Sequence, residues 1–279
     1  MPVPSLQELA NQSDAQMDIA LGAALIAKDA YPNLEPSALL ADLDEMSAPL
    51  FRLRLEEKSA LEQALRLGEH IYESLGFRGN ESDYYDPRNS LLSDVLARKL
   101  GIPITLAIVY CEIARRVGVP ARGIGFPGHF LVRVDQPGRP QERPLTIDPF
   151  FGGRVLDEEA IVRLLRRALG PEQTLRPNDH LAPASPRSVL VRMLTNLKAI
   201  YLTRGDHARA HLAADRILLF APNLPAVLRE RGILAARLGA HESARADFAR
   251  ALELLPEGAE ARAIRGQLVE LERKGRRLN

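Results

Sequence analysis

Hydrophobic and polar residues follow a helical period through the first part of the chain. Residues 1–76 read as helices. In the last of them an apolar stripe that requires a packing partner recurs at spacings of three and four, over Leu61, Ala64, Leu65, Gly68, Tyr72 and Leu75. Ser5 and Ser59 each stand three residues before a glutamate, a pattern typical of a capping box at a helix start. We interpret this region as a helical scaffold.

A second helical pattern lies between two breaks, Gly101-Ile102-Pro103 and Gly118-Val119-Pro120. The residues between them, 105–117, predict a helix, with a polar face at Glu112, Arg115 and Arg116. A polar loop over residues 77–88 precedes the first break and delivers the chain to Asn89-Ser90, whose side chains are suited to cap a helix over the following residues.

After the second break the hydrophobic period shortens to two residues. Residues 130–134 and 145–148 read as strands, and the proline-rich residues 135–144 between them predict a hairpin loop. If the strands fold about the middle of that loop, residues whose numbers sum to 277 lie opposite each other. His129 and Asp148 satisfy that sum, so we expect them to hydrogen-bond across the strands, whereas a shift of one residue would separate them.

The C-terminal part of the chain repeats itself. Four prolines between residues 171 and 186 indicate a linker. Beyond it, matching residues recur every 34 positions, which is typical of tetratricopeptide repeats. The matching pairs are Gly205 and Gly239, Ala210 and Ala244, and Pro222 and Pro256. We therefore predict a domain over 1–170, a linker over 171–186 and a helical repeat module over 187–279.

The order of elements predicts the fold class. A helix, a strand led by a histidine and a strand that ends in an aspartate form the layout of a papain-like or transglutaminase-like core. The fold class is therefore α+β, with a helical N-terminal region, a small antiparallel sheet and an α-helical repeat module after it.

Composition and charge narrow the classes of partner. The chain carries 37 Lys and Arg against 36 Asp and Glu, so its net charge of +1 favours neither nucleic acid nor a membrane surface. No apolar run is long enough to span a membrane. The single cysteine indicates a reducing compartment, and we expect a cytoplasmic protein.

The single thiol, Cys111, lies deep within its predicted helix. Its neighbours at three and four residues are mostly apolar, and a thiol is activated at a helix N-terminus or beside a cation. We interpret Cys111 as a buried hydrophobe first and as a nucleophile second. His207 and His211 have a spacing compatible with metal binding, but no third ligand is evident, and we predict neither a metal nor a cofactor.

Three motifs resemble those of the bacterial SirB-type family, which joins a transglutaminase-like domain to tetratricopeptide repeats. They are Tyr84-Tyr85-Asp86-Pro87-Arg88-Asn89-Ser90, Gly101-Ile102-Pro103-Ile104-Thr105-Leu106 and Gly125-Phe126-Pro127-Gly128-His129-Phe130-Leu131. The resemblance implies a transglutaminase-like fold and a regulatory role. It also implies that His129 and Asp148 take two positions of the catalytic triad.

The third triad position departs from the pattern of active relatives. In them a cysteine opens the helix that ends at a Gly-Ile-Pro-Ala-Arg-like turn, and that turn here is residues 118–122. The resemblance therefore places Pro103 where the nucleophile would stand. Proline is favourable in the first turn of a helix, but it offers no nucleophile, and Thr105 is a conceivable stand-in.

Two functions follow from these observations. The first is a non-catalytic scaffold or regulator that binds a protein or peptide, with the repeats as a second recognition surface. Its candidate ligand-binding residues are Asn89, Pro103, Tyr84 and Tyr85. The alternative is a hydrolase or acyltransferase that uses Thr105 or Cys111 with the His129–Asp148 pair. The proline at the nucleophile position favours the first.

Overall fold

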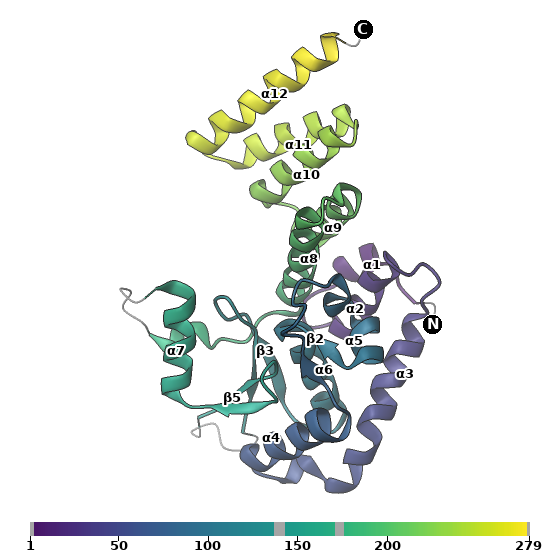
Figure 1. The fold of residues 1–279 in the computed structure, drawn as a ribbon, viewed down its shortest axis with the longest axis vertical. Helices are drawn as coiled ribbons and strands as arrows, with labels where there is room; N and C mark the ends of the chain where they lie inside the picture. Colours follow the sequence, from purple (N-terminus) through teal and green to yellow (C-terminus); the bar gives the residue numbers. More distant parts are fainter. Residues whose placement is uncertain (1–2, 137–142, 171–175, 278–279) are drawn as a thin grey trace. The chain divides into compact units, whose positions relative to one another are not determined.

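The computed structural model describes residues 3–136, 143–170 and 176–277 of the chain (Figure 1). Two compact units divide it, Met1–Leu190 and Val191–Asn279. Among the described residues, no helix is long and apolar enough to cross a membrane.

Short helices build the start of the first unit. The predicted capping box forms at Ser5, whose hydroxyl accepts from the Glu8 N–H at 3.2 Å while its own N–H donates to the Glu8 carboxylate at 2.7 Å. Ser59 caps its helix by accepting from the Glu62 N–H at 3.3 Å. The helices are α1 (Leu6–Ala10), α2 (Ile19–Lys28), α3 (Pro36–Ser47) and α4 (Ala60–Gly68), with 3₁₀ turns η1 (Ala48–Leu53) and η2 (Leu55–Glu57) and the π-helix η3 (Glu69–Ser74).

The segment before the central helix differs from the prediction at its caps. Asn89 and Ser90 lie inside a 3₁₀ turn, η4 (Pro87–Ser90), which Asp86 caps by accepting from the Arg88 N–H at 3.0 Å. The next helix begins without a side-chain cap, so Asn89 is available for bonds elsewhere. The elements that follow η4 are α5 (Leu92–Arg98) and the short strand β2 (Leu100–Gly101), which pairs in parallel with β1 (Arg78–Gly79).

The central helix α6 (Pro103–Arg116) begins two residues earlier than predicted, with Pro103 at its first position. Nearly all of its side chains are buried, because α6 lies between helices and the sheet. It contacts α2, α3, α4 and α5, and also β3 and β4 (Figure 1). The predicted helix is therefore the core of the first unit.

An antiparallel four-stranded sheet follows, in the order β3-β4-β5-β6. The predicted register is wrong by two residues: Val132 lies opposite Ile147 and Val134 opposite Leu145, so opposed residue numbers sum to 279 rather than 277. Side chains alternate between the two faces of a sheet, so a shift of two keeps every residue on its predicted face. The strands are β3 (Ala121–Ile124), β4 (Leu131–Val134), β5 (Leu145–Asp148) and β6 (Arg154–Leu156).

The described part of the proline-rich segment is attached to the sheet. After α7 (Glu158–Leu169) and the 3₁₀ turn η5 (Pro177–His180), Pro183 forms an antiparallel bridge with Ile124 of β3. The Ala184 N–H donates to the Gly123 carbonyl at 2.8 Å. The first turn of α8 (Pro186–Thr203) is held within the same unit, because Arg187 pairs with Asp14 at 3.1 Å.

The second unit has the helices expected of the repeat module, with a shared core. Gly205 and Gly239, one repeat apart, both adopt left-handed conformations that end the preceding helix, at φ values of 72° and 82°. Ala210 and Ala244 are both fully buried. The helices after α8 are α9 (His207–Phe220), α10 (Pro225–Arg237), α11 (His241–Leu254) and α12 (Ala259–Arg277).

Candidate functional site

The predicted hydrogen bond between His129 and Asp148 forms, with Nε2 of the imidazole 3.0 Å from Oδ1 of the carboxylate. His129 stands in the turn before β4 and is 12% exposed, while Asp148 ends β5 and is fully buried. A carboxylate oxygen only accepts, so Nε2 carries the imidazole proton and Nδ1 is left as the basic nitrogen. A nucleophile acting with this pair would have to meet Nδ1.

The two oxygens of Asp148 have different surroundings. Oδ1 also accepts from the N–H groups of Phe150 at 3.1 Å and Phe151 at 3.3 Å, so it has three donors. Oδ2 is buried and receives no hydrogen bond from the residues that the structure describes. The Arg154 guanidinium approaches it, with Nη2 at 3.8 Å. Asp148 is therefore firmly oriented through Oδ1, while Oδ2 lacks a hydrogen-bond donor among the described residues.

Thr105 is placed in a hydrogen-bond network of its own. Its side chain is fully buried one turn into α6, and its hydroxyl lies 2.7 Å from the Asn89 carbonyl, to which it donates. The same oxygen accepts from the Ile102 N–H at 3.1 Å. Within the described parts of the chain, no hydrogen bond joins Thr105 to His129. These bonds give Thr105 a structural role, because they fix the N-terminal turn of α6 to the backbone at Asn89.

Asn89 connects the preceding loop to this hydrogen-bond network. Its side-chain amide donates to the carbonyls of Asp83 at 2.7 Å and Tyr84 at 3.3 Å, and its Oδ1 accepts from the Asn80 amide at 3.0 Å. The side chain is fully buried, so its contacts are internal ones that shape the loop. Asn89 thereby holds the loop backbone at Asp83 and Tyr84.

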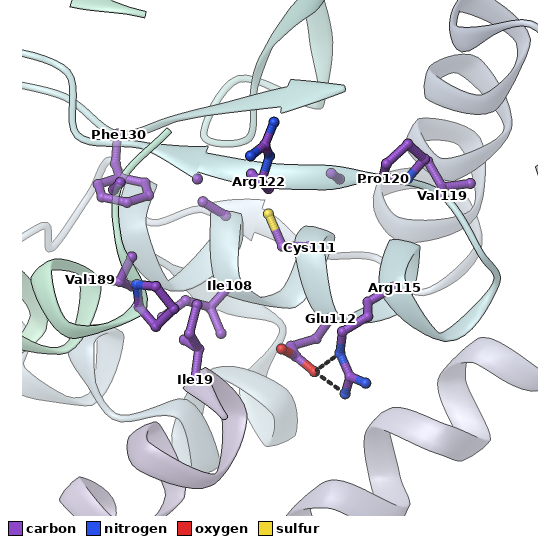
Figure 2. A pocket seen from close by; sticks show the side chains of 15 residues that line it. Ile19, Ile108, Cys111, Glu112, Arg115, Val119, Pro120, Arg122, Phe130 and Val189 are labelled. Atoms are coloured by element: carbon purple, nitrogen blue, oxygen red, sulfur yellow. Dashed lines mark hydrogen bonds and ion pairs between the residues drawn. The ribbon is translucent and has the colours of Figure 1, made fainter. Parts of the chain in front are cut away.

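Cys111 lies in the wall of a pocket of about 240 Å³ between α6, β3 and the start of α8 (Figure 2). The pocket is lined largely by apolar side chains, with the Glu112–Arg115 ion pair at one side. Burial, and secondarily the neighbouring Glu112, raise the pKa of the thiol well above its usual range. That shift disfavours the thiolate, so the environment is the opposite of the one a cysteine nucleophile needs.

Tyr84 and Tyr85 are brought together and joined to the histidine through two phenylalanines that the sequence analysis missed. We call Tyr84, Tyr85, Phe150 and Phe151 the aromatic surface. Ring centroids are 5.3 Å apart for Tyr84–Tyr85, 5.9 Å for Tyr84–Phe150 and 5.1 Å for Phe150–Phe151, and His129 lies 6.4 Å from both phenylalanines. Tyr85 is 67% exposed and Phe151 is 39% exposed, so part of this surface faces solvent. Two aromatic residues placed directly after a triad-like Asp-Pro were a signal for it.

Tyr72 is a further neighbour of the pair that no sequence motif indicated. It lies in the π-helix η3, an irregularity that is frequent at functional sites. Its ring packs against Gly153, where a Cβ atom would lie 2.3 Å from the ring. Its hydroxyl is buried and has no hydrogen-bond partner in the described part of the chain. Burial, with smaller contributions from Tyr110, Asp148 and Cys111, raises the pKa of Tyr72 well above its usual range.

Among the described residues, no group of three His, Cys, Asp or Glu side chains is placed to hold a metal ion. His207 and His211 lie in α9 of the second unit. The site of interest is therefore the His129–Asp148 pair with the aromatic surface beside it.

Comparison with known proteins agrees with this architecture. Residues 37–195 match the transglutaminase-like superfamily, and residues 197–269 match a tetratricopeptide repeat family. The chain is 40% identical over 276 residues to a UPF0162 protein of Xylella fastidiosa, covering 96% of this chain and 95% of that protein. It is 32% identical to a UPF0162 protein of Pseudomonas aeruginosa, covering 94% and 93%.

A shorter match extends to eukaryotes. Human F-box only protein 21 is 30% identical over 164 residues, which is 56% of this chain and 24% of that protein. No solved structure matches the chain significantly.

Proposed function

Because the chain belongs to the transglutaminase-like superfamily and to the UPF0162 family, with tetratricopeptide repeats after the first domain, we propose that it is a non-catalytic binding protein. Its first unit binds a protein or peptide segment at the aromatic surface, with the His129–Asp148 pair orienting the ligand. Its repeats supply a second surface for protein partners. The protein thereby acts as a scaffold or regulator.

The observation that carries the proposal is Pro103 at the first position of α6. The resemblance to transglutaminase-like proteins places the nucleophile there, and the pyrrolidine ring has no hydroxyl or thiol. The two nearest substitutes are engaged otherwise: Thr105 donates to the Asn89 carbonyl, and Cys111 is a neutral thiol in an apolar pocket. A base without a nucleophile favours binding over acyl transfer.

The aromatic surface supports the binding role. Tyrosine and phenylalanine offer large contact areas at low cost in conformational entropy, and such residues dominate recognition surfaces. Asn89 fixes the loop backbone at Asp83 and Tyr84 through its buried amide, so the rings are held before a ligand arrives. A preorganised surface loses less entropy on binding.

An alternative function keeps the retained pair as a working base. His129 presents Nδ1 as its basic nitrogen and Asp148 orients the ring, which is the arrangement of a general base and its partner. In that case the protein is a hydrolase or acyltransferase, and Thr105 or Cys111 is the nucleophile. Movement of α6 or of the turn at His129 would be required to bring either one to Nδ1.

A peptide array probed with the full-length protein tests the binding role. We expect capture of a subset of 12-residue peptides by the parent, and loss of that capture in Tyr85→Ala, whose exposed ring leaves the core intact. Leu61→Ala, which removes an exposed apolar side chain on α4, is the matched control and should retain capture. Equal capture by the parent and Tyr85→Ala would refute binding at the aromatic surface.

Turnover assays on acyl-amide and ester substrates distinguish the alternative function, a hydrolase or acyltransferase, from the binding role. We expect no turnover by the parent. Turnover that disappears in both His129→Ala and Thr105→Ala would establish an enzyme with threonine as its nucleophile, and loss in Cys111→Ala would assign the thiol instead.

A further inference from the structure

Arg154 lies across the His129–Asp148 pair from the neighbouring strand. Gly152 and Gly153, both in left-handed conformations, turn the chain between β5 and β6 and bring Arg154 directly opposite Asp148. The guanidinium carbon lies 5.1 Å from the centroid of the Phe151 ring, within the range of a cation–π contact. The arginine therefore touches both the buried carboxylate and the aromatic surface.

The contact with the carboxylate is incomplete. The 3.8 Å between Arg154 Nη2 and Asp148 Oδ2 is too long for a hydrogen bond. Asp148 is fully buried, and Oδ2 has no other donor among the described residues. A buried carboxylate oxygen without a donor is costly, so this atom marks a place for a further N–H group. Arg154 is itself 55% exposed, and exposed ion pairs contribute little stability.

The loop beside the aromatic surface adds negative charge. Glu81 and Asp83, which lie three residues and one residue before Tyr84, are exposed and form no ion pair with described residues. The nearby cation Arg88 is matched by Asp86 at 2.7 Å, and Asp86 also lies 3.4 Å from Arg98. The loop that carries Tyr84 and Tyr85 thus also carries two exposed carboxylates without an ion partner among the described residues, which favours a cationic ligand.

We propose that the aromatic surface binds an arginine side chain of a partner peptide, and that Arg154 occupies the place of that side chain in the free protein. The proposal rests on the proposed function, since it names the chemistry of the ligand at the same surface. The incoming guanidinium stacks on Phe151 and donates to Asp148 Oδ2, while Glu81 and Asp83 attract further basic residues of the peptide. Arg154 swings into solvent as the ligand arrives.

An arginine guanidinium fits this site better than a lysine ammonium, which acts as a point charge. Its planar fork offers several N–H groups at once, so it can donate to a carboxylate oxygen while its face covers an aromatic ring. Arg154 already makes one of these contacts and nearly makes the other. The internal residue therefore shows the geometry that a ligand residue would complete.

Titration calorimetry with two defined peptides tests the proposal on the full-length protein. The first peptide is Gly-Gly-Arg-Gly-Gly with blocked ends, and the second carries citrulline, the neutral isostere, in place of arginine. We expect Arg154→Gln to bind the arginine peptide about tenfold more tightly than the parent, the size of one cation–π contact with a charged hydrogen bond. The citrulline peptide should bind weakly to both.

Two further variants test what causes the expected gain in affinity of Arg154→Gln. Arg163→Gln removes one positive charge from α7, where the arginine is exposed and pairs only loosely with Glu159 at 3.5 Å, so it should bind like the parent. Adding Phe151→Leu to Arg154→Gln should abolish the gain in affinity, because the aromatic face is lost.

Three outcomes overturn the inference. If Arg163→Gln gains as much affinity as Arg154→Gln, bulk charge explains the effect. If the citrulline peptide binds as well as the arginine peptide, the surface binds peptides without reading a cation, and the proposed function survives alone. If neither peptide binds either variant, the arginine site is refuted, and the peptide array decides the proposed function separately.

Discussion

His129 and Asp148 are joined at 3.0 Å although they are not opposite each other in the sheet. Val132 faces Ile147, so the pair is offset by two residues along the strands. The imidazole spans this offset because His129 stands in the turn ahead of β4, where its backbone is free of the ladder. The bond therefore links the turn before one strand to the end of the next.

Removal of this imidazole should lower stability. His129→Ala removes a hydrogen bond to a buried carboxylate, and bonds to charged groups contribute about 1.5–3 kcal/mol. We expect a loss of that size in denaturant titration of the full chain. His129→Gln, whose amide nitrogen can reach the position of Nε2, should recover part of the loss. An unchanged midpoint in His129→Ala would mean that Asp148 is held by its backbone donors alone.

The thiol should make the protein sensitive to alkaline pH. The pKa of Cys111 is raised in the folded state, so the neutral thiol is favoured there while the unfolded chain ionises at about pH 8.5. Stability should be unaffected below that pH and should fall as pH rises above it. Unfolding titrations of Cys111→Ala at pH 8 and pH 10 should show a smaller decline than the parent. Rapid alkylation of Cys111 in the native protein at neutral pH would contradict the raised pKa.

The two repeats differ at one helix cap, which predicts opposite effects of two substitutions. Asp206 caps α9 by accepting from the Arg209 N–H at 3.0 Å, whereas its equivalent Ala240, 34 residues on, gives α11 no cap. A capping side chain contributes about 0.5–2 kcal/mol. Asp206→Ala should therefore destabilise the second unit and Ala240→Asp should stabilise it. Thermal unfolding of the full chain measures both, and a destabilising Ala240→Asp would show that α11 begins differently.

Two glycines of the repeats should also respond in opposite directions. A Cβ at Gly232 would lie 2.7 Å from the Phe248 ring, whereas one at Gly266, the equivalent position, would meet nothing within 4 Å. Gly232→Ala should cost about 1–3 kcal/mol through overpacking. Gly266→Ala should gain about 0.5–1 kcal/mol, because alanine favours the helix. Equal effects in an unfolding assay would contradict the close packing at Phe248.

Local patterns predicted most of the architecture because each one is fixed by neighbouring residues. The capping box at Ser5 and the 34-residue period need no knowledge of distant contacts. The register of β4 and β5 was not accessible in the same way, because a loop of ten residues permits several alignments. Only the face of the sheet on which each side chain lies was predictable, since residues two apart in a strand share a face.

The site was predicted in part for the same reason. His129 and Asp148 follow from motif and spacing, but Arg154 reaches Asp148 only through the turn at Gly152 and Gly153. Asn89 has the residue type of a helix cap, yet Asp86 takes that role and leaves the asparagine to bond the loop. Such competition between nearby polar residues is decided by the folded backbone.

The bridge between Pro183 and Ile124 has a consequence for how the first unit avoids self-association. β3 is one of the two edge strands of its sheet, and an exposed strand edge is a template on which other chains can add. The Ala184 N–H already occupies the Gly123 carbonyl, and Pro183 has no N–H with which to extend a ladder outward. Pro183 and Ala184 would be missing from a chain cut after residue 170. We therefore expect such a chain to expose the edge of β3 and to aggregate through it, although all four strands of the sheet are still present.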